Sequence, residues 1–517
     1  MKQLGLWLAV CIFTVVGCGD RNEAFDEWVG VQGPYIVGNR LVYLDQNLDE
    51  LVVTIPKAGD TGLGWTRIPV EAGARVVGVL EKEEALMLQS PDEGVLQIAF
   101  PETQVVKSFE VESPYDRFKF QWDPPLIAGY FSETAQGSEQ TLFLNKGEIT
   151  FVDPLKDKDA VDTMVLPTYG GAPLGIDFSP EVTFGVKTSK FAFVRWKSFV
   201  TIVKLGSGDK PVSVKLKPPD SEAVIMPGSM QFIKSGGKLL AFFLSQGTED
   251  LFLIDVDLDA FGPGGSGVHV NIFPTAAGAV SFQPFTDAED TLVIAVACAT
   301  AKKVVMVYPL SSAVKSYSVD MTPREITIFD MPASGEKGAL VFDNSGQGYT
   351  YYFVELDQLT EKKSKAFHEF SLLAPVARAY MLPDELHFLV IHASAGAVAT
   401  PMSLVALEDG SVVSLGGNLS VSSEQFSADR TRMYALAGKA GKTYLVAFDF
   451  TSVGSLSSRD INVTNGIKPT SLRYIESEGL LILSDSAGEM LMMVPDDFEV
   501  RGDAAQYFVP YLSGTGQ

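Results

Sequence analysis

The sequence predicts an all-β fold, and three observations support this prediction. Short runs rich in Val, Ile, Phe, Tyr and Leu recur along the chain, such as Leu51–Ile55, Phe199–Val203 and Leu480–Ser484. Gly, Pro, Asp or Ser bound these runs, which is the pattern of β-strands separated by turns. The 47 Gly and 28 Pro are spread along the chain, and amphipathic stretches with helical spacing are scarce.

The runs group into a repeat that is marked by an aromatic residue near the end of a short apolar run. The marker is found at Tyr130, Phe178, Phe232, Phe282, Phe329, Tyr380, Phe426 and Tyr474, with successive spacings of 48, 54, 50, 47, 51, 46 and 48 residues. Two strong strands and a weaker one usually follow each marker. Four-stranded units at this period indicate the blades of a β-propeller. Stacking the blades buries their faces, and closing the ring leaves no end face bare.

The number of blades depends on how far the repeat extends toward the N-terminus. Weaker units near Ile36 and Val79 extend the repeat toward the N-terminus and bring the count to nearly ten. Propellers commonly have four to eight blades, so we predict about eight, with two units merged at the closure or one unit a decorated loop. Two smaller propellers, or β-sandwiches in tandem, are the alternatives.

The first residues have the features of an export signal. Lys2 precedes the apolar stretch Leu4–Val16, which is the length of a signal's hydrophobic region and too short to span a membrane as a helix. We therefore expect residues 1–17 to be a signal peptide and residues 18–33 to be a flexible tether. The repeat domain would cover residues 34–512, and residues 513–517 would form a disordered tail.

The signal ends in Val15-Val16-Gly17-Cys18, which resembles the lipobox of bacterial lipoproteins, with Val15 in place of the usual Leu. The resemblance implies cleavage before Cys18 and acylation of its sulfur, which would anchor the protein in the cell envelope. Gly19 after the cysteine implies sorting to the outer membrane. The alternative is an ordinary signal peptide in which Cys18 is incidental.

Charge and cysteine content narrow the possible partners. The 40 basic and 64 acidic residues give a formal net charge of −24, which argues against nucleic acid and against direct docking onto anionic lipids. We expect the chain to meet the membrane through the acyl anchor on Cys18 and to bind another envelope protein or a polymer. Cys298 ends the apolar run Leu292–Cys298, so we predict a buried, inert thiol.

The sequence predicts no metal site. His387 and His392 are five positions apart on a predicted strand, so they would point to opposite faces. Asp255, Asp257 and Asp259 resemble the start of a calcium loop. The following residues lack the Gly and Glu that such a loop requires, so we interpret the run as a solvated strand end.

No catalytic or cofactor residues are predicted either. Neither Gly-x-Ser-x-Gly nor His-Glu-x-x-His occurs, although a Ser-His-Asp triad assembled in space would leave no such motif. The segment from Ala58 to Trp65 resembles a shortened form of the blade-docking repeat of quinoprotein-like propellers. Ser90 to Gly94 matches half of a sialidase-type Asp box. No Trp-Asp dipeptide recurs, so the resemblance is to the WD40/quinoprotein-like superfamily in the broad sense.

These observations lead to one functional hypothesis and one alternative. The hypothesis is a lipid-anchored envelope β-propeller that serves as a non-enzymatic binding or interaction scaffold. The alternative is a propeller enzyme, either a lactonase-like or glycan-cleaving hydrolase or a quinone-dependent dehydrogenase.

Overall fold

The computed structural model describes the chain between residues 31 and 508, apart from internal segments. Residues 1–30 and 509–517 lie outside the described residues, as do 57–64, 81–82, 91–93, 112, 123–124, 136–144, 157–159, 185–186, 218–222, 247, 263–265, 288–289, 331–336, 349, 357–365, 373, 385, 394–401, 408–409, 416–418, 440, 451–456, 463–468, 485–489 and 499–505. Cys18, the predicted signal peptide and the predicted tail are therefore not placed.

The described strands form ten four-stranded antiparallel sheets, which we number as blades 1 to 10 in chain order. Blade 1 contains β1 (Val31–Val37), β2 (Arg40–Asp45), β3 (Glu50–Thr54) and β4 (Trp65–Pro69), and blade 2 contains β5 (Arg75–Leu80), β6 (Ala85–Ser90), β7 (Val95–Phe100) and β8 (Val105–Glu110). Blade 3 contains β9 (Arg117–Trp122), β10 (Pro125–Tyr130), β11 (Glu148–Val152) and β12 (Val161–Val165), and blade 4 contains β13 (Gly175–Phe178), β16 (Phe191–Trp196), β17 (Phe199–Lys204) and β18 (Val212–Lys215). Blade 5 contains β19 (Gln231–Ser235), β20 (Lys238–Leu244), β21 (Asp250–Asp257) and β22 (Val268–Pro274).

Blades 6 to 10 repeat the same order. Blade 6 contains β23 (Ala279–Thr286), β24 (Leu292–Cys298), β25 (Lys303–Tyr308) and β26 (Ala313–Ser318), and blade 7 contains β27 (Glu325–Asp330), β28 (Lys337–Phe342), β29 (Thr350–Glu355) and β30 (Phe367–Ser371). Blade 8 contains β31 (Val376–Met381), β32 (His387–His392), β33 (Met402–Ala406) and β34 (Val412–Leu415), and blade 9 contains β35 (Ser420–Phe426), β36 (Arg432–Lys439), β37 (Lys442–Asp449) and β38 (Ser457–Asn462). Blade 10 contains β39 (Ser471–Ile475), β40 (Leu480–Ser484), β41 (Met490–Pro495) and β42 (Gln506–Phe508). A short turn of 3-10 helix, η5 (Glu476–Glu478), joins β39 to β40.

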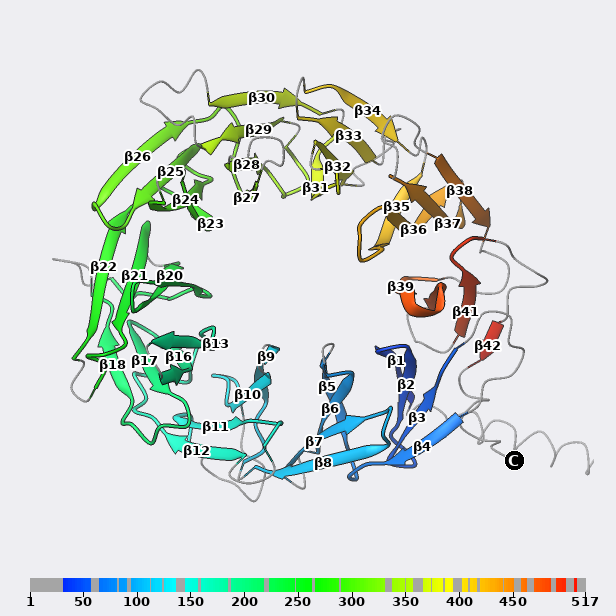
Figure 1. The fold of residues 1–517 in the computed structure, drawn as a ribbon, viewed down its shortest axis with the longest axis horizontal. Helices are drawn as coiled ribbons and strands as arrows, with labels where there is room; N and C mark the ends of the chain where they lie inside the picture. Colours follow the sequence, from blue (N-terminus) through cyan, green and yellow to red (C-terminus); the bar gives the residue numbers. More distant parts are fainter. Residues whose placement is uncertain are drawn as a thin grey trace, which may run out of the picture.

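The blades are arranged in one closed ring around a central channel (Figure 1). The first strand of each blade lies toward the channel and the fourth lies at the rim, and blade 10 lies beside blade 1. Every blade is a contiguous stretch of chain, so no strand is exchanged between the first and last blades. Blade 4 alone among the described blades carries an inserted hairpin, formed by β14 (Val182–Phe184) and β15 (Lys187–Ser189).

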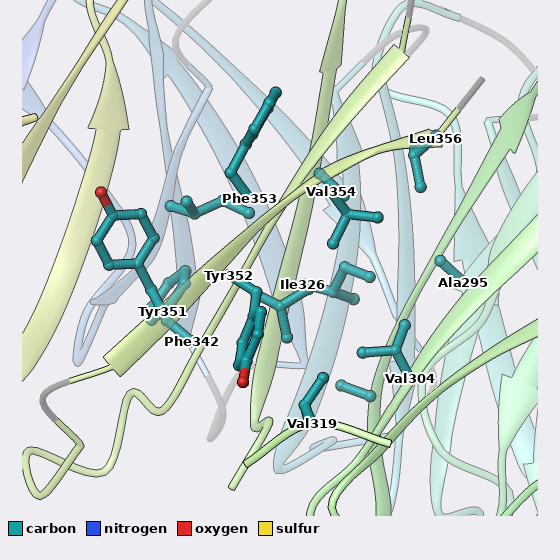
Figure 2. Close-up of a cluster of buried hydrophobic side chains, with 14 of the residues drawn as sticks. Ala295, Val304, Val319, Ile326, Phe342, Tyr351, Tyr352, Phe353, Val354 and Leu356 are labelled. Carbon is teal, nitrogen blue, oxygen red and sulfur yellow. The ribbon is translucent and has the colours of Figure 1, made fainter. Parts of the chain in front are cut away.

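The position of a strand within its blade explains its composition. The second and third strands are mostly apolar in their middle positions because neighbouring blades cover both of their faces. All seven residues of β24 are buried, whereas most of β26 at the rim is exposed. Successive side chains of a strand point to opposite faces of the sheet. Figure 2 shows this in β29, where Tyr351 and Phe353 project to one side and Tyr352 and Val354 to the other. Both sides meet buried neighbours, such as Ile326.

Buried apolar clusters fill the spaces between adjacent blades. One large cluster joins blades 6, 7 and 8, and eight smaller clusters each join one other pair of neighbours. The cluster that closes the ring contains Leu41, Tyr43 and Val52 from blade 1 and Ile475, Leu480, Ile482 and Met493 from blade 10. The side-chain amide of Asn39 also donates a hydrogen bond of 3.0 Å to Glu478 across this junction.

The structure confirms the predicted all-β propeller of four-stranded blades and corrects the number of blades. The described residues form ten blades instead of about eight, in a single ring. The units near Ile36 and Val79 are complete blades, and neither the merged closure nor the alternative of two rings is observed. The prediction was low because we gave the usual size of propellers more weight than the repeat count. The first strand also begins at Val31, upstream of the predicted boundary at residue 34.

The aromatic markers mostly identify the innermost strands. Seven of the eight lie on the first strand of a blade, whereas Tyr130 ends β10, the second strand of blade 3. Several markers contact an aromatic ring of the neighbouring blade, as Tyr380 does with Phe426 at 4.9 Å between ring centroids. Phe232 and Phe193 make a similar contact at 5.0 Å. Among the described residues, no helix is long and apolar enough to cross a membrane.

Candidate functional site

The innermost strands form the wall of the channel, and their charges differ from those of the chain as a whole. Their described ionisable side chains are six basic residues (Arg75, Arg117, Lys119, Lys234, Arg378 and Arg473) and three acidic residues (Asp177, Glu325 and Glu424). Acidic residues outnumber basic ones by 64 to 40 in the complete sequence. The described channel wall therefore reverses the charge balance of the molecule.

Each of these three wall carboxylates is already engaged. Glu424 accepts hydrogen bonds from Arg378 at 2.8 Å and from the Tyr380 hydroxyl at 2.9 Å, across the junction of blades 8 and 9. Burial, followed by the effect of Glu424, raises the pKa of Tyr380 to about 12. Glu325 accepts hydrogen bonds from Asn344 and Ser281, and burial raises the pKa of its carboxyl group.

Asp177 lies between blades 3, 4 and 5 in an ion pair that depends on a glycine. Arg195 Nε is 2.7 Å from Asp177 Oδ2, and both side chains are largely buried. Arg195 lies opposite Gly175 in the pairing of β13 with β16, where a Cβ atom would come within 2.4 Å of the guanidinium. The missing side chain leaves room for Arg195. Burial raises the pKa of Asp177, and the charges of Arg195 and Lys119 oppose this rise.

Three cations of the wall are not neutralised in this way. Arg117 in blade 3, Lys234 in blade 5 and Arg473 in blade 10 are exposed. None of them forms an ion pair or a side-chain hydrogen bond within the described part of the chain. Because every described wall carboxylate has a partner, these cations give the channel an excess of positive charge.

A pocket of about 420 Å³ opens onto the channel where the ring closes. We call it the closure pocket, and it joins the innermost strands of blades 9, 10, 1 and 2. Its lining consists of Pro34, Tyr35, Ile36, Gly38, Val79, Gln425, Arg473 and Tyr474. Its volume lies in the range of small-molecule sites.

A second cleft, of about 590 Å³, lies between blades 3 and 4 beside the inserted hairpin. Apolar residues such as Leu126 and Phe151 line part of it, and charged residues of both signs line the rest. Lys156 lies 3.6 Å from Asp153, so part of this charge is paired locally. The mixed lining does not favour one chemical class of ligand.

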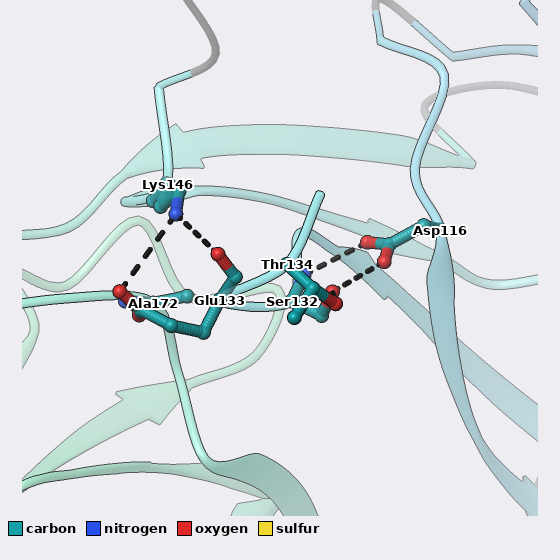
Figure 3. A network of polar contacts seen from close by, with 6 residues as sticks. All are labelled: Asp116, Ser132, Glu133, Thr134, Lys146 and Ala172. Atoms are coloured by element: carbon teal, nitrogen blue, oxygen red, sulfur yellow. Dashed lines mark hydrogen bonds and ion pairs between the residues drawn. The ribbon is translucent and has the colours of Figure 1, made fainter. Parts of the chain in front are cut away.

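A group of polar side chains at the opposite end of blade 3 from this cleft has a structural explanation. Asp116 accepts hydrogen bonds from the backbone and the hydroxyl of Ser132, while Glu133 accepts one from the backbone N–H of Ala172 (Figure 3). The hydrogen bond from Ala172 lowers the pKa of Glu133. Lys146 donates to the backbone carbonyl of Glu133. These contacts tie the chain after β10 to the connection between blades 3 and 4.

The sequence candidates for metal binding are not brought together. His387 contacts Asp384 at 2.6 Å, whereas His392 contacts Ser403. Asp255 pairs with Lys238 at 2.7 Å, and Asp257 accepts the backbone N–H groups of Asp259 and Ala260 in a turn. No group of three or more His, Cys, Asp or Glu in the described segments is placed to hold a metal ion.

One Ser–His pair needed spatial information to be recognised, and it is sealed from solvent. His392 Nε2 lies 2.7 Å from Ser403 Oγ, and His392 Nδ1 lies 3.2 Å from the carbonyl oxygen of Pro375. Ser403 is completely buried, and a backbone carbonyl occupies the position that a triad carboxylate would take. Burial lowers the pKa of His392. The pair therefore satisfies polar groups within blade 8 and its connection to blade 7.

Cys298 is buried as predicted, and burial raises the pKa of its thiol. Most of the segment that resembles the quinoprotein repeat, residues 57–64, and the centre of the half Asp box, residues 91–93, lie outside the described residues.

Comparisons with known proteins leave the family of this chain open. No protein family matches the chain, and no curated protein matches its sequence. Among solved structures it is similar to the dihydro-heme d1 dehydrogenase NirN in complex with DHE, at 11% identity over 73% of each chain with a TM-score of 0.40. It is also similar to a eukaryotic initiation factor, at 14% identity over 74% of this chain and 86% of that one with a TM-score of 0.41.

A third similar structure is apo AztD from Citrobacter koseri, at 11% identity over 66% of this chain and 86% of that chain with a TM-score of 0.33. All three scores are below 0.5, so these likenesses carry no argument about function. The assignment of the fold rests on the ten sheets themselves.

The sequence did not indicate any residue of the closure pocket as a site residue. Ile36, Val79 and Tyr474 entered only as positions of the repeat, and Arg473, the neighbour of Tyr474, did not enter. Positions 35, 79, 425 and 473 line one pocket only because the ring closes. The sequence signal that could have indicated this site is an arginine, Arg473, directly before the marker aromatic Tyr474.

Proposed function

We propose that this chain is a lipid-anchored binding scaffold of a bacterial envelope and that its channel wall is the binding surface. The observation that carries the proposal is the set of three exposed, unpaired cations on innermost strands, in a chain whose net charge is −24. Polar groups that are not committed to holding the blades together are available to a ligand. The closed ring holds them on rigid strands, which lowers the entropic cost of binding.

The anchor is the part of this proposal that the sequence supports, through the lipobox-like segment before Cys18. The thioether of a lipoprotein requires the cysteine sulfur. Cys18→Ala should therefore abolish labelling by radioactive palmitate and release the protein from the membrane fraction. Labelling that persists in this variant would contradict the anchor and leave the binding surface to be tested separately.

The binding surface is tested by comparing two sets of substitutions in the body of the protein, residues 19–517. The channel set is Arg117→Ala, Lys234→Ala and Arg473→Ala. The control set removes the same charge from outermost strands, with Arg67→Ala, Lys215→Ala and Lys315→Ala. Each protein is immobilised and exposed to detergent-solubilised envelope extract, and the retained proteins and polymers are identified by mass spectrometry and carbohydrate analysis.

We expect a partner that the wild type and the control set retain and that the channel set loses. Equal retention by all three proteins would place the binding surface elsewhere. Chemical turnover of a retained molecule would favour the alternative of a propeller enzyme.

A further inference from the structure

The closure pocket has a lining that selects a particular kind of ligand. Among its described lining residues, Arg473 is the one charged residue and none is acidic. The rest of the described lining is mixed: Pro34, Ile36 and Val79 lie beside the rings of Tyr35 and Tyr474, and polar atoms make up about half of the surface. A concave site that combines apolar surface with a few polar groups is the usual form of a small-molecule site.

The polar groups of this pocket are available for binding. Arg473 forms no ion pair with a described residue, and the side-chain amide of Gln425 and the hydroxyl of Tyr35 have no hydrogen-bond partner in the described structure. Burial raises the pKa of Tyr35, so this hydroxyl stays protonated and can donate. A guanidinium, an amide and a hydroxyl together supply donors suited to a carboxylate or a phosphate.

The described acids near the pocket contact groups other than Arg473, so none of them forms an ion pair with it. Glu84 lies 3.7 Å from Arg40, Glu478 accepts the amide of Asn39, and Asp496 accepts the Tyr474 hydroxyl at 2.8 Å. The more distant acids are screened, since the Debye length is about 8 Å at physiological ionic strength. An anion can therefore bind here despite the negative charge of the whole molecule.

We propose that the closure pocket binds a small organic anion whose carboxylate or phosphate contacts Arg473 and whose apolar body packs on Ile36 and Val79. This inference deepens the proposed binding function and rests on it, because it names the chemical class of one ligand of the channel wall. Arginine binds both groups through paired hydrogen bonds, so the pocket lining accommodates either group.

The position of the pocket gives this ligand a second effect. Its lining comes from the first two and the last two blades, and no chain segment connects blade 10 to blade 1. A ligand bound across this junction stabilises the closed ring, because anything that binds only the native state raises the free energy of unfolding. Saturating ligand should therefore raise the Tm of the whole ring.

The test uses three probes that share a benzene ring, namely benzoate, phenyl phosphate and benzyl alcohol. Each is titrated into the body, residues 19–517, and binding is followed by saturation-transfer difference NMR and by the shift in Tm. We expect at least one anion to bind about tenfold or more tightly than the neutral alcohol and to raise the Tm. The tighter of the two anions identifies the group that the pocket prefers.

The decisive variant is Arg473→Ala, with Lys215→Ala as its control. Both residues are exposed cations without an ion pair in the described structure, but Lys215 lies on the outermost strand β18 and is not part of the pocket. Losing a charge-assisted contact should weaken anion binding by about tenfold or more in Arg473→Ala and leave it unchanged in Lys215→Ala. Arg473→Lys, which keeps the charge, should bind with intermediate affinity. The Tm of each variant without ligand verifies that it is folded.

Two results would overturn the inference. One is that neither anion binds more tightly than benzyl alcohol, and the other is that Arg473→Ala and Lys215→Ala bind the anions equally. Either result leaves the proposed scaffold standing if the channel set of substitutions still abolishes partner capture. Anion binding that depends on Arg473, without any capture that depends on the channel, would contradict the scaffold and keep the pocket as a small-molecule site.

Discussion

The junction that closes the ring and the junction between blades 4 and 5 each hold two neighbouring blades together, but they differ in the size of their buried core and in whether a chain segment connects the blades. In the described part of each core, seven buried residues join blade 10 to blade 1, whereas fourteen join blade 4 to blade 5. The latter include four phenylalanines, and the chain itself links the two blades through residues 216–230. The closure has no such link, so non-covalent contacts alone, namely this core and the hydrogen bond from Asn39 to Glu478, keep the two ends of the ring together.

This difference indicates where the ring is weakest. A chain connection keeps neighbouring blades close even when their contacts open, whereas the blades at the closure separate freely. The closure pocket lies at this junction, which is therefore both the least supported part of the ring and the site of the proposed small ligand.

The most severe test removes blade 10. A protein of residues 19–469 would expose the faces of blades 1 and 9 that pack on blade 10. Each large apolar side chain on those faces loses about 1.5–3 kcal/mol of burial, and the total rivals the stability of a whole domain, about 5–15 kcal/mol. We expect aggregation or loss of cooperative unfolding in a thermal scan beside residues 19–517. Cooperative melting of both proteins within a few degrees would show that the ring does not depend on its closure.

A matched pair of cavities sharpens the comparison. Leu480→Ala creates a cavity at the closure and Leu239→Ala creates one between blades 4 and 5, and both leucines are buried. Each substitution should cost about 2–5 kcal/mol in chemical denaturation. Only Leu480→Ala should also speed amide hydrogen exchange in blades 1 and 10 together, because there the cavity opens a junction without a chain link. Equal local exchange in the two variants would mean that the closure is no weaker than the other junction.

A smaller effect is expected from single hydrogen bonds. Asn39→Ala removes the bond to Glu478 across the closure, and Gln231→Ala removes a bond of 3.0 Å to the carbonyl of Phe282 between blades 5 and 6. Each bond contributes about 0.5–1.5 kcal/mol, and we expect Asn39→Ala to lie at the upper end of this range. The measurement is the free energy of unfolding in urea. A larger loss for Gln231→Ala would contradict the ranking of the two junctions.

The smallest change in stability is expected on acidification. It comes from His392 in blade 8, which is joined to both of its neighbouring blades by chain connections. Burial holds the pKa of His392 below its value in the unfolded chain, so the unfolded state binds more protons as the pH falls through that value. The contribution of His392 to stability is therefore complete at neutral pH and is lost on acidification. His392→Gln should flatten the pH dependence of Tm below about pH 6.5. An unchanged slope in His392→Gln would exclude this residue as the cause.

The repeat was readable from the sequence because both faces of each middle strand are buried. A run such as Leu292–Cys298 is apolar at every position for this reason, and the aromatic markers recur because they fill the space between blades. Blade 3 shows the limit of this signal. Its innermost strand carries Phe118 and Phe120, yet the chosen marker, Tyr130, lies on the next strand, so the spacing identifies blades better than individual strands.

The site was not readable in the same way. Arg473 lies between Leu472 and Tyr474, and Gln425 follows a run of polar residues, as polar residues do on many strands that are not binding sites. Their place beside Tyr35 and Val79 depends on how many blades the ring contains, because closure with fewer blades would bring different strands together. An error of two in the number of blades was therefore enough to hide the pocket.

Because each blade is a contiguous stretch of chain, the ring has a defined order of completion during synthesis. Asn39 and its partner Glu478 are 439 positions apart, a length that a ribosome translates in roughly 20–90 s at 5–20 residues per second. Throughout this interval the face of blade 1 that carries Leu41, Tyr43 and Val52 has no intramolecular partner. Blade 10 of another copy whose ring is still open presents the same complementary face, so completed chains that meet before closure can join head to tail and grow into an open filament.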